Sequence, residues 1–211
     1  MYPAKTTRNV STTTRKNLSN FTASSYNSDF LTRLQQRIAK SNKTKDSLYT
    51  AMFKDVLTDV SNRIAFSMDA EETNTPHFFA IFNISDFSNV NTAYGNDTGD
   101  WLLVRTVDIL KQVFKKGKIY RTGSDEFVVT VEVGGGMETE NMIEYVKDAY
   151  RRLTALQNTP VGKLNFGYRA AIVKKSQNLN TSVIAVLKDM INKSAAAGMN
   201  DIGYNDLDQI S

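Results

Sequence analysis

The stretch RTGSDEF at residues 121–127 lies between two apolar runs that both have the composition of β-strands. Within it, Gly123, Ser124 and Asp125 are poor strand formers, and Glu126 follows them directly. The pattern therefore predicts a β-hairpin whose turn carries two neighbouring carboxylates. Two interpretations are open at this point: a plain polar turn, or a turn that holds carboxylates where a metal ion and a phosphate meet.

Around this hairpin the chain alternates between helical and strand patterns. Apolar spacing predicts helices over 28–38, 140–156 and 181–197, and Gly198 is predicted to end the last of these. Two more helices are predicted to begin near 47, with Val56 on the buried face, and near 61. Residues 89–114 are predicted to begin as a loop and to continue as a helix. Strands are predicted over 78–84, 118–122, 126–133 and 164–173, with a glycine break at 134–136. This order predicts an α/β domain with a central mixed sheet flanked by helices.

The composition excludes several classes of site. The 211 residues include no cysteine, so disulfides and thiolate metal sites are excluded, and the one histidine, His77, is predicted to be a surface loop residue. No apolar stretch approaches the length of about 18 residues that a membrane span needs. The N-terminus also lacks the apolar core of a secretory signal. We therefore predict a cytoplasmic protein with no membrane span.

Charge is unevenly distributed along the chain. Residues 1–50 carry nine Lys/Arg and two Asp/Glu, a net charge of +7, whereas the rest carries 17 and 20, a net charge of −3; the two sum to the overall +4. We divide the chain into a basic Ser/Thr/Asn-rich tail (1–27), a helical linker (28–46) and a domain (47–211). The tail suits a protein partner or assembly, phosphates or acidic lipid, and the alternative is a solvated tail. No base-reading module is visible, which argues against specific nucleic-acid binding.

Five segments resemble, in order and spacing, the motifs of the GGDEF family, the diguanylate cyclases. These segments are DVLTDVSNR (55–63), NISDFSNVN (83–91), YGNDTGDWLL (94–103), RTGSDEF (121–127) and NFGYRAAI (165–172). The resemblance covers about residues 50–205. It implies a palm-like nucleotide-cyclase fold in which two facing domains each hold one GTP. The reaction joins them into cyclic di-GMP, and two divalent ions bridge the reacting oxygens.

The resemblance implies metal-binding carboxylates at the hairpin turn and at the end of the first strand. Asp125 and Glu126 retain the turn carboxylates, but the position of the strand aspartate is Asn83. Because side chains alternate on a strand, Ser85 shares the face of Asn83 and Asp86 does not. An amide oxygen can bind Mg²⁺ but brings no negative charge. We therefore predict a metal site of Asp125, Glu126 and a weakened Asn83, with weak Mg²⁺ binding.

Further departures concern the triphosphate. A family lysine is replaced by Ser88, and a family lysine and arginine by Ala195 and Met199. The resemblance places Gly123 and Ser124 next to the nucleotide. Ser124 replaces the second glycine of the signature, so we expect its side chain to crowd the nucleotide. The family's product-inhibition motif, R-x-x-D, is absent from residues 114–117.

The base-reading positions, in contrast, keep suitable side chains. The resemblance assigns Asn91 and Asp100 to guanine, with the amide donating and accepting and the carboxylate accepting from the ring N–H and amino group. The alternative is purely structural: Asn91 caps the following segment, and Asp100 caps the helix that begins near Trp101.

Together these features predict a degenerate GGDEF domain without catalytic activity that serves as a guanine-nucleotide-binding or protein-interaction and assembly module. One alternative is an active diguanylate cyclase or related nucleotidyltransferase that makes cyclic di-GMP from two GTP, with Asp125 and Glu126 as catalytic residues. The other is a structural protein with this fold and no ligand.

Overall fold

The computed structural model describes residues 45–72, 75–159, 162–175, 182–196 and 202–207. The chain divides into two compact units, residues 1–51 and 52–211. Residues 45–51 of the first unit are described, and they begin helix α3 (Lys45–Phe53). The predicted tail and the helix over 28–38 lie outside the described residues, so the proposed boundaries at 27 and 46 stay predictions.

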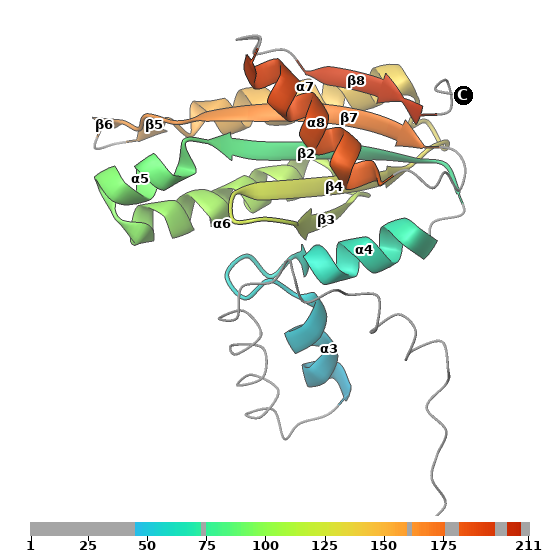
Figure 1. Ribbon diagram of the computed structural model, residues 1–211, viewed down its shortest axis with the longest axis horizontal. Coiled ribbons are helices and arrows are strands. Elements are labelled where there is room, and N and C mark those ends of the chain that lie inside the picture. The colour runs from blue at the N-terminus through green and yellow to red at the C-terminus, as the bar shows by residue number, and fades with distance from the viewer. Residues whose placement is uncertain (1–44, 73–74, 160–161, 176–181, 197–201, 208–211) are drawn as a thin grey trace, which may run out of the picture. The chain divides into compact units, whose positions relative to one another are not determined.

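The second unit is built on a mixed six-stranded sheet with the strand order β1-β3-β4-β2-β7-β8 (Figure 1). β2 pairs antiparallel with β4 and β7, β3 pairs antiparallel with β4, and the edge pairs β1–β3 and β7–β8 are parallel. The strands are β1 (Ser61–Asn62), β2 (His77–Ser85), β3 (Lys118–Arg121), β4 (Glu126–Glu132), β7 (Gly167–Lys175) and β8 (Gly203–Asp206); β5 (Asn158–Thr159) and β6 (Gly162–Lys163) form a separate small hairpin.

Helices cover both faces of this sheet because β2 is apolar on both sides. Its even-numbered residues from Phe78 to Ile84 pack with α6 (Asn96–Val113) and α7 (Thr139–Ala155). Phe79 and Ile81 pack on the other face with α4 (Arg63–Glu72) and α8 (Val183–Ala196), which crosses the near face in Figure 1. The α/β fold with a mixed sheet flanked by helices, predicted from the sequence, is confirmed.

The long apolar elements lie close to their predicted positions. β2, β3, β4, α4, α7 and α8 each overlap the predicted segment. The glycine break is a turn in which Gly134, Gly135 and Gly136 have φ values of 104°, 60° and 91°, a region that side chains disfavour. Gly198 lies outside the described residues, so its role as a helix end stays a prediction.

The loop predicted at the start of 89–114 is wrong. That region contains helix α5 (Phe87–Tyr94) and the first turn of α6, separated by Gly95 with φ 86°. Val90 is the one fully buried residue of α5. An eight-residue helix with a single buried position shows too little hydrophobic periodicity to be recognised in the sequence.

Two smaller expectations are also wrong. Val56 does not lie on a buried helical face: α3 ends at Phe53, and Val56 is 72% exposed in the turn that follows. The Asp55 carboxylate makes this turn by accepting hydrogen bonds from the backbone N–H and the hydroxyl of Thr58. His77 is not a loop residue but the first residue of β2, where it is partly buried.

Candidate functional site

The hairpin turn and the C-terminal end of β2 meet at one end of the central strands of the sheet. Asn83 of β2 lies directly opposite Glu126 of β4 in the antiparallel register. Just beyond this pair, the Ile84 N–H donates a 2.9 Å hydrogen bond to the carbonyl oxygen of Asp125. The backbone therefore fixes Asn83 and the Asp125–Glu126 dipeptide side by side; that they form a metal site stays a prediction.

On the other side of β2, Asn83 lies opposite Arg169 of β7. Residues that are opposite in register point to the same face of a sheet. Glu126, Asn83 and Arg169 consequently form one row across three strands, on the face covered by α4 and α8. The described part of the chain offers Arg169 no hydrogen bond or ion pair, and its side chain is partly exposed.

The carboxylate of Glu126 is engaged by the protein itself. Its Oε1 accepts a 2.6 Å hydrogen bond from the hydroxyl of Thr122, and its Oε2 lies 3.2 Å from Nζ of Lys188 on α8. The Glu126 side chain is only 10% exposed, whereas that of Lys188 is 42% exposed. Both oxygens of the most buried carboxylate at the turn thus already have partners.

The rest of the turn is braced by Arg121. Its Nη2 donates to the carbonyl oxygen of Ser124 at 2.6 Å, and its Nη1 lies 3.2 Å from Oδ1 of Asp55. Burial alone would raise the pKa of Asp55, but the Thr58 hydrogen bonds and the Arg121 guanidinium outweigh it and hold that pKa below its ordinary value. The turn after α3 and the signature turn are therefore joined by an ion pair.

The Asp125 carboxylate has fewer described partners than that of Glu126. Its Oδ1 accepts a 3.0 Å hydrogen bond from the hydroxyl of Ser124. A Cβ at position 123 would lie 3.1 Å from Cβ of Glu126, a tight contact that would require the two residues to shift by a few tenths of an ångström. The Ser124 hydroxyl thus points toward Asp125. The expected crowding of a nucleotide by Ser124 stays a prediction.

A second group of polar residues lies where α5 packs on α6. A Cβ on Gly99 would fall 1.9 Å from Oδ1 of Asn91 and 3.2 Å from Cζ of Phe87, so only glycine leaves room for the Asn91 amide. The Oδ1 atom is buried, and the described residues supply no hydrogen-bond partner for it. Asp100 follows Gly99 directly and is exposed.

The capping roles considered for Asn91 and Asp100 are wrong. Asp100 lies inside α6, which begins at Asn96 and has Gly95 at its N-cap position. Asn91 lies inside α5, and only its backbone carbonyl serves the helix end, by accepting from the Gly95 N–H. The amide and the carboxylate are thus free of the structural duties that offered the main alternative to ligand binding.

The remaining predicted positions are placed as follows. Asp86 has a left-handed backbone with φ 60°, is exposed after the end of β2, and does not join the row of Asn83. Ser85 is partly buried on the Asn83 face, and Ser88 is exposed on α5. Met199 and the side chain of Ala195 lie outside the described part of the structure.

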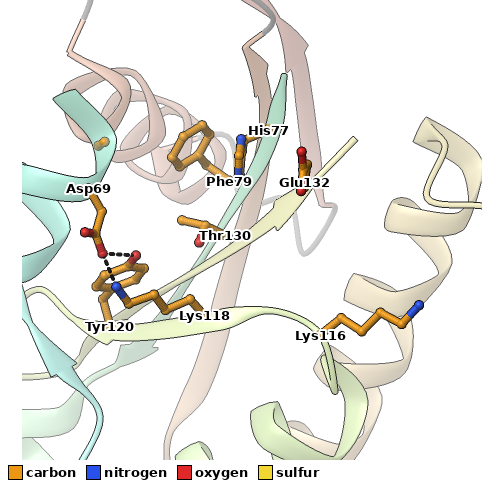
Figure 2. Close-up of a pocket in the computed structure, with 9 residues that line it drawn as sticks. Asp69, His77, Phe79, Lys116, Lys118, Tyr120, Thr130 and Glu132 are labelled. Carbon is orange, nitrogen blue, oxygen red and sulfur yellow. Dashed lines mark hydrogen bonds and ion pairs between the residues drawn. The ribbon is translucent and has the colours of Figure 1, made fainter. Parts of the chain in front are cut away.

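A cavity of about 360 Å³ lies at the opposite end of the same strands (Figure 2). Its polar lining includes Lys116, Lys118, Asp69 and Glu132, and Lys118 and the hydroxyl of Tyr120 both contact the Asp69 carboxylate. The two lysines and two acids balance in charge. His77 and Glu132, which face each other in register, are six register pairs away from the Asn83–Glu126 pair, so this cavity is separate from the signature turn.

Comparison with known proteins decides the family. The family model described as the diguanylate cyclase GGDEF domain matches residues 51–200. The chain belongs to the GGDEF family. Among curated relatives, the GGDEF domain is 36% identical over 95 residues to the probable diguanylate cyclase DgcI of Escherichia coli K12, covering 44% of this chain and 21% of that protein. It is 27% identical over 145 residues to an uncharacterized membrane protein of Staphylococcus haemolyticus, covering 66% of this chain and 40% of that protein.

Solved structures agree on the fold of this GGDEF domain. The coiled coil and GGDEF domain of DgcB from Caulobacter crescentus, in complex with c-di-GMP, superposes with a TM-score of 0.63 at 16% identity, covering 92% of this chain and all of that one. Diguanylate cyclase SiaD from Pseudomonas aeruginosa, in complex with its activator SiaC, gives 0.63 at 15% identity, covering 92% and 74%. Within the described residues, none of the helices combines the length and hydropathy of a membrane span.

The GGDEF family implies a pair of divalent ions, and the donor set here does not fit them. Asn83 supplies an uncharged oxygen, and Glu126 is already bonded to the Thr122 hydroxyl and the Lys188 ammonium. Asp125 alone retains a carboxylate whose described partner is only a neighbouring hydroxyl. Sequence reasoning did not identify Lys188, Arg169 or Thr122 as members of this site. In the sequence, Lys188 follows the apolar run at 183–187 and precedes Asp189, a pattern that does not distinguish it from any other polar residue of an amphipathic helix.

Proposed function

We propose that this GGDEF domain is a guanine-nucleotide-binding module that does not synthesise cyclic di-GMP. The observation that carries the proposal is the Asn91 amide, whose Oδ1 is buried against Gly99 without a partner among the described residues. A buried polar atom left unsatisfied costs about 1–3 kcal/mol. A small rotation of the Asn91 side chain would bring this atom to a guanine edge, which presents N–H donors.

The neighbouring groups support a purine ligand. Exposed Asp100 adds a carboxylate beside Gly99, suited to accept from a ring N–H and an amino group. Phe87 reaches the same spot, with its Cζ within 3.2 Å of a Cβ built on Gly99, and offers an apolar ring. The Asn91 amide and the Phe87 ring thus both lie against Gly99, and the next residue of α6 supplies the Asp100 carboxylate.

The absence of cyclase activity is supported at the signature turn. Phosphoryl transfer of the family type relies on metal ions to bring the reacting oxygens together and to stabilise their charge. The turn offers one lightly bound carboxylate, Asp125, one carboxylate paired with Lys188, and an amide at position 83. We therefore assign the nucleotide a regulatory or assembly role rather than that of a substrate.

Binding of proteins is the second role that we propose, and a relative supports it. SiaD was solved in complex with a protein activator. In this chain, the excess of positive charge in residues 1–50 would offer an acidic partner an electrostatic contact. The match spans less than half of the length of these curated relatives.

Calorimetry with GTP, GDP and guanosine tests the nucleotide proposal. We expect binding heat for all three ligands, and a large loss of affinity in Asn91→Ala and in Asp100→Ala. Incubation with GTP and Mg²⁺ or Mn²⁺ tests catalysis. Formation of cyclic di-GMP that disappears in Asp125→Ala would show an active cyclase and overturn the proposal; no heat with any guanine compound would leave a domain without this ligand.

A further inference from the structure

We propose that Lys188 is a built-in cation that replaces a divalent metal ion beside Glu126, so that the domain holds nucleotide phosphates without Mg²⁺. The inference rests on the proposed nucleotide binding for its phosphate part. The replacement of the metal by a side chain stands independently of it.

The contacts of Glu126 leave a metal ion in competition with the protein. Lys188 Nζ lies 3.2 Å from Oε2, and the Thr122 hydroxyl lies 2.6 Å from Oε1. Because the Glu126 side chain is only 10% exposed, its charge is screened weakly by water and needs a nearby cation. A metal ion that bound Glu126 would compete with the ammonium for Oε2 and would be repelled by its positive charge.

The charge of the site gives the same answer. Asp125 and Glu126 contribute two negative charges, and Lys188 and Arg169 contribute two positive charges, so these four side chains sum to zero. Two Mg²⁺ ions would add four positive charges to this neutral set. Hard divalent ions depend on anionic oxygen ligands, and the uncharged Asn83 in the same row supplies none.

The same inventory suits a phosphate that is bound directly by side chains. Arg169 lies in the row of Glu126 and Asn83, two strands from β4, which is about 10 Å across the sheet. It has no ion pair with any described residue, and guanidinium groups bind phosphate oxygens in a bidentate manner. Lys188 is 42% exposed, so its ammonium can contact an incoming anion while it stays near Glu126.

The first test measures Mn²⁺ binding by electron paramagnetic resonance in the absence of nucleotide. We compare wild type, Asn83→Asp, Lys188→Met and the double variant Asn83→Asp/Lys188→Met. Lys193→Met is the matched control, because Lys193 lies on the same helix and pairs with Asp189 at the surface, 2.7 Å away. We expect the double variant to bind Mn²⁺ at least tenfold more tightly than Asn83→Asp, and Lys193→Met to equal wild type.

Equal Mn²⁺ affinity in Asn83→Asp and in the double variant would overturn the assignment of Lys188. Lys188→Arg keeps the charge and should behave as wild type, which separates loss of the cation from a general disturbance of α8. Urea unfolding of each variant establishes that it is folded under the binding conditions.

The second test measures GTP and guanosine binding in excess MgCl₂ and in EDTA. We expect the GTP affinity to be the same in both, and Lys188→Met to lower it about tenfold or more while guanosine binding is unchanged. GTP binding that requires Mg²⁺, with guanosine bound normally, would refute the metal-free phosphate site and leave the proposed nucleotide function intact. If neither compound binds, the proposed function fails, and the Mn²⁺ comparison still decides whether Lys188 replaces a metal.

Discussion

The contact between Gly99 and Asn91 yields a prediction that joins the fold to the proposed ligand. In Gly99→Ala, the new Cβ would lie 1.9 Å from Asn91 Oδ1, 3.0 Å from its Cγ and 3.2 Å from Phe87 Cζ. The first distance cannot exist between unbonded atoms. Because the Asn91 amide is the end of a flexible side chain, we expect it to rotate away while the backbone of α5 and α6 stays in place.

The magnitudes follow from that movement. Replacing a helical glycine by alanine gains about 1 kcal/mol, and overpacking against a ring and a side chain costs about 1–3 kcal/mol. The free energy of unfolding should therefore fall by no more than about 2 kcal/mol. Loss of one neutral hydrogen bond to guanine costs about 0.5–1.5 kcal/mol, which weakens guanosine binding by about 2- to 13-fold.

Isothermal titration with guanosine, together with urea unfolding, measures both effects. A double-mutant cycle provides the control: in Asn91→Ala the amide is already absent, so adding Gly99→Ala should change guanosine affinity little. Wild-type affinity in Gly99→Ala would refute the role of Asn91 in reading the base. Additive losses in the cycle would show that Gly99 acts on the ligand by a route other than the Asn91 amide.

Three further predictions concern stability and the tail. Asp55→Asn should lower the free energy of unfolding near neutral pH by about 1.5–3 kcal/mol, since the Arg121 ion pair and the Thr58 hydrogen bonds act on a charged group. Because the pKa of Asp55 is lowered in the folded state, this stabilisation is present above the ordinary pKa of about 3.9 and is lost as the pH falls below it. A plot of the free energy of unfolding against pH should show this acid loss for wild type but not for Asp55→Asn. Burial raises the pKa of the Tyr168 hydroxyl, which shares a 2.6 Å hydrogen bond with Thr106. The contribution of this hydroxyl to the free energy of unfolding is therefore complete below the unfolded pKa of about 10 and is lost above it by about 1.4 kcal/mol per pH unit. Urea unfolding of Tyr168→Phe should not show that loss. Deletion of residues 1–27 should leave the urea midpoint of the domain unchanged, and affinity of the full chain for a partner of the tail should fall steeply with salt.

The strands of the sheet could be predicted where their burial produces a clear hydrophobic pattern in the sequence. β2 is a nearly continuous apolar run because it is buried on both faces, and the hairpin of β3 and β4 has a turn of poor strand formers between two such runs. β8 was not predicted: its four residues, Gly203–Asp206, are mostly polar and pair only at the edge of the sheet. A strand that gains its stability from one neighbour has no hydrophobic pattern that identifies it in advance.

The residues of the candidate site differ in the same way. Asn83 and Glu126 belong to two predicted strands, and the antiparallel register brings them together as the motifs suggest. The role of Asn91 depended on where α5 and α6 begin, and those limits are set by Gly95 and by helix packing rather than by periodicity. For that reason capping was a sound alternative from sequence, and it is removed by the positions of Asn91 inside α5 and of Asp100 inside α6.

Lys188 could not be recognised because its effect depends on a contact between distant segments, and it changes how Asn83 is to be understood. A carboxylate at position 83 would give three negative charges with Asp125 and Glu126; the amide reduces these to two, and the ammonium beside Glu126 offsets one more, before the positive charge of Arg169 is counted. Both changes remove negative charge from the same few atoms, so they oppose metal binding in the same direction. Reversal of the change at position 83 or at position 188 alone restores only half of the missing negative charge. Comparison of the motif residues by themselves therefore underestimates how much this site differs from one that holds two cations.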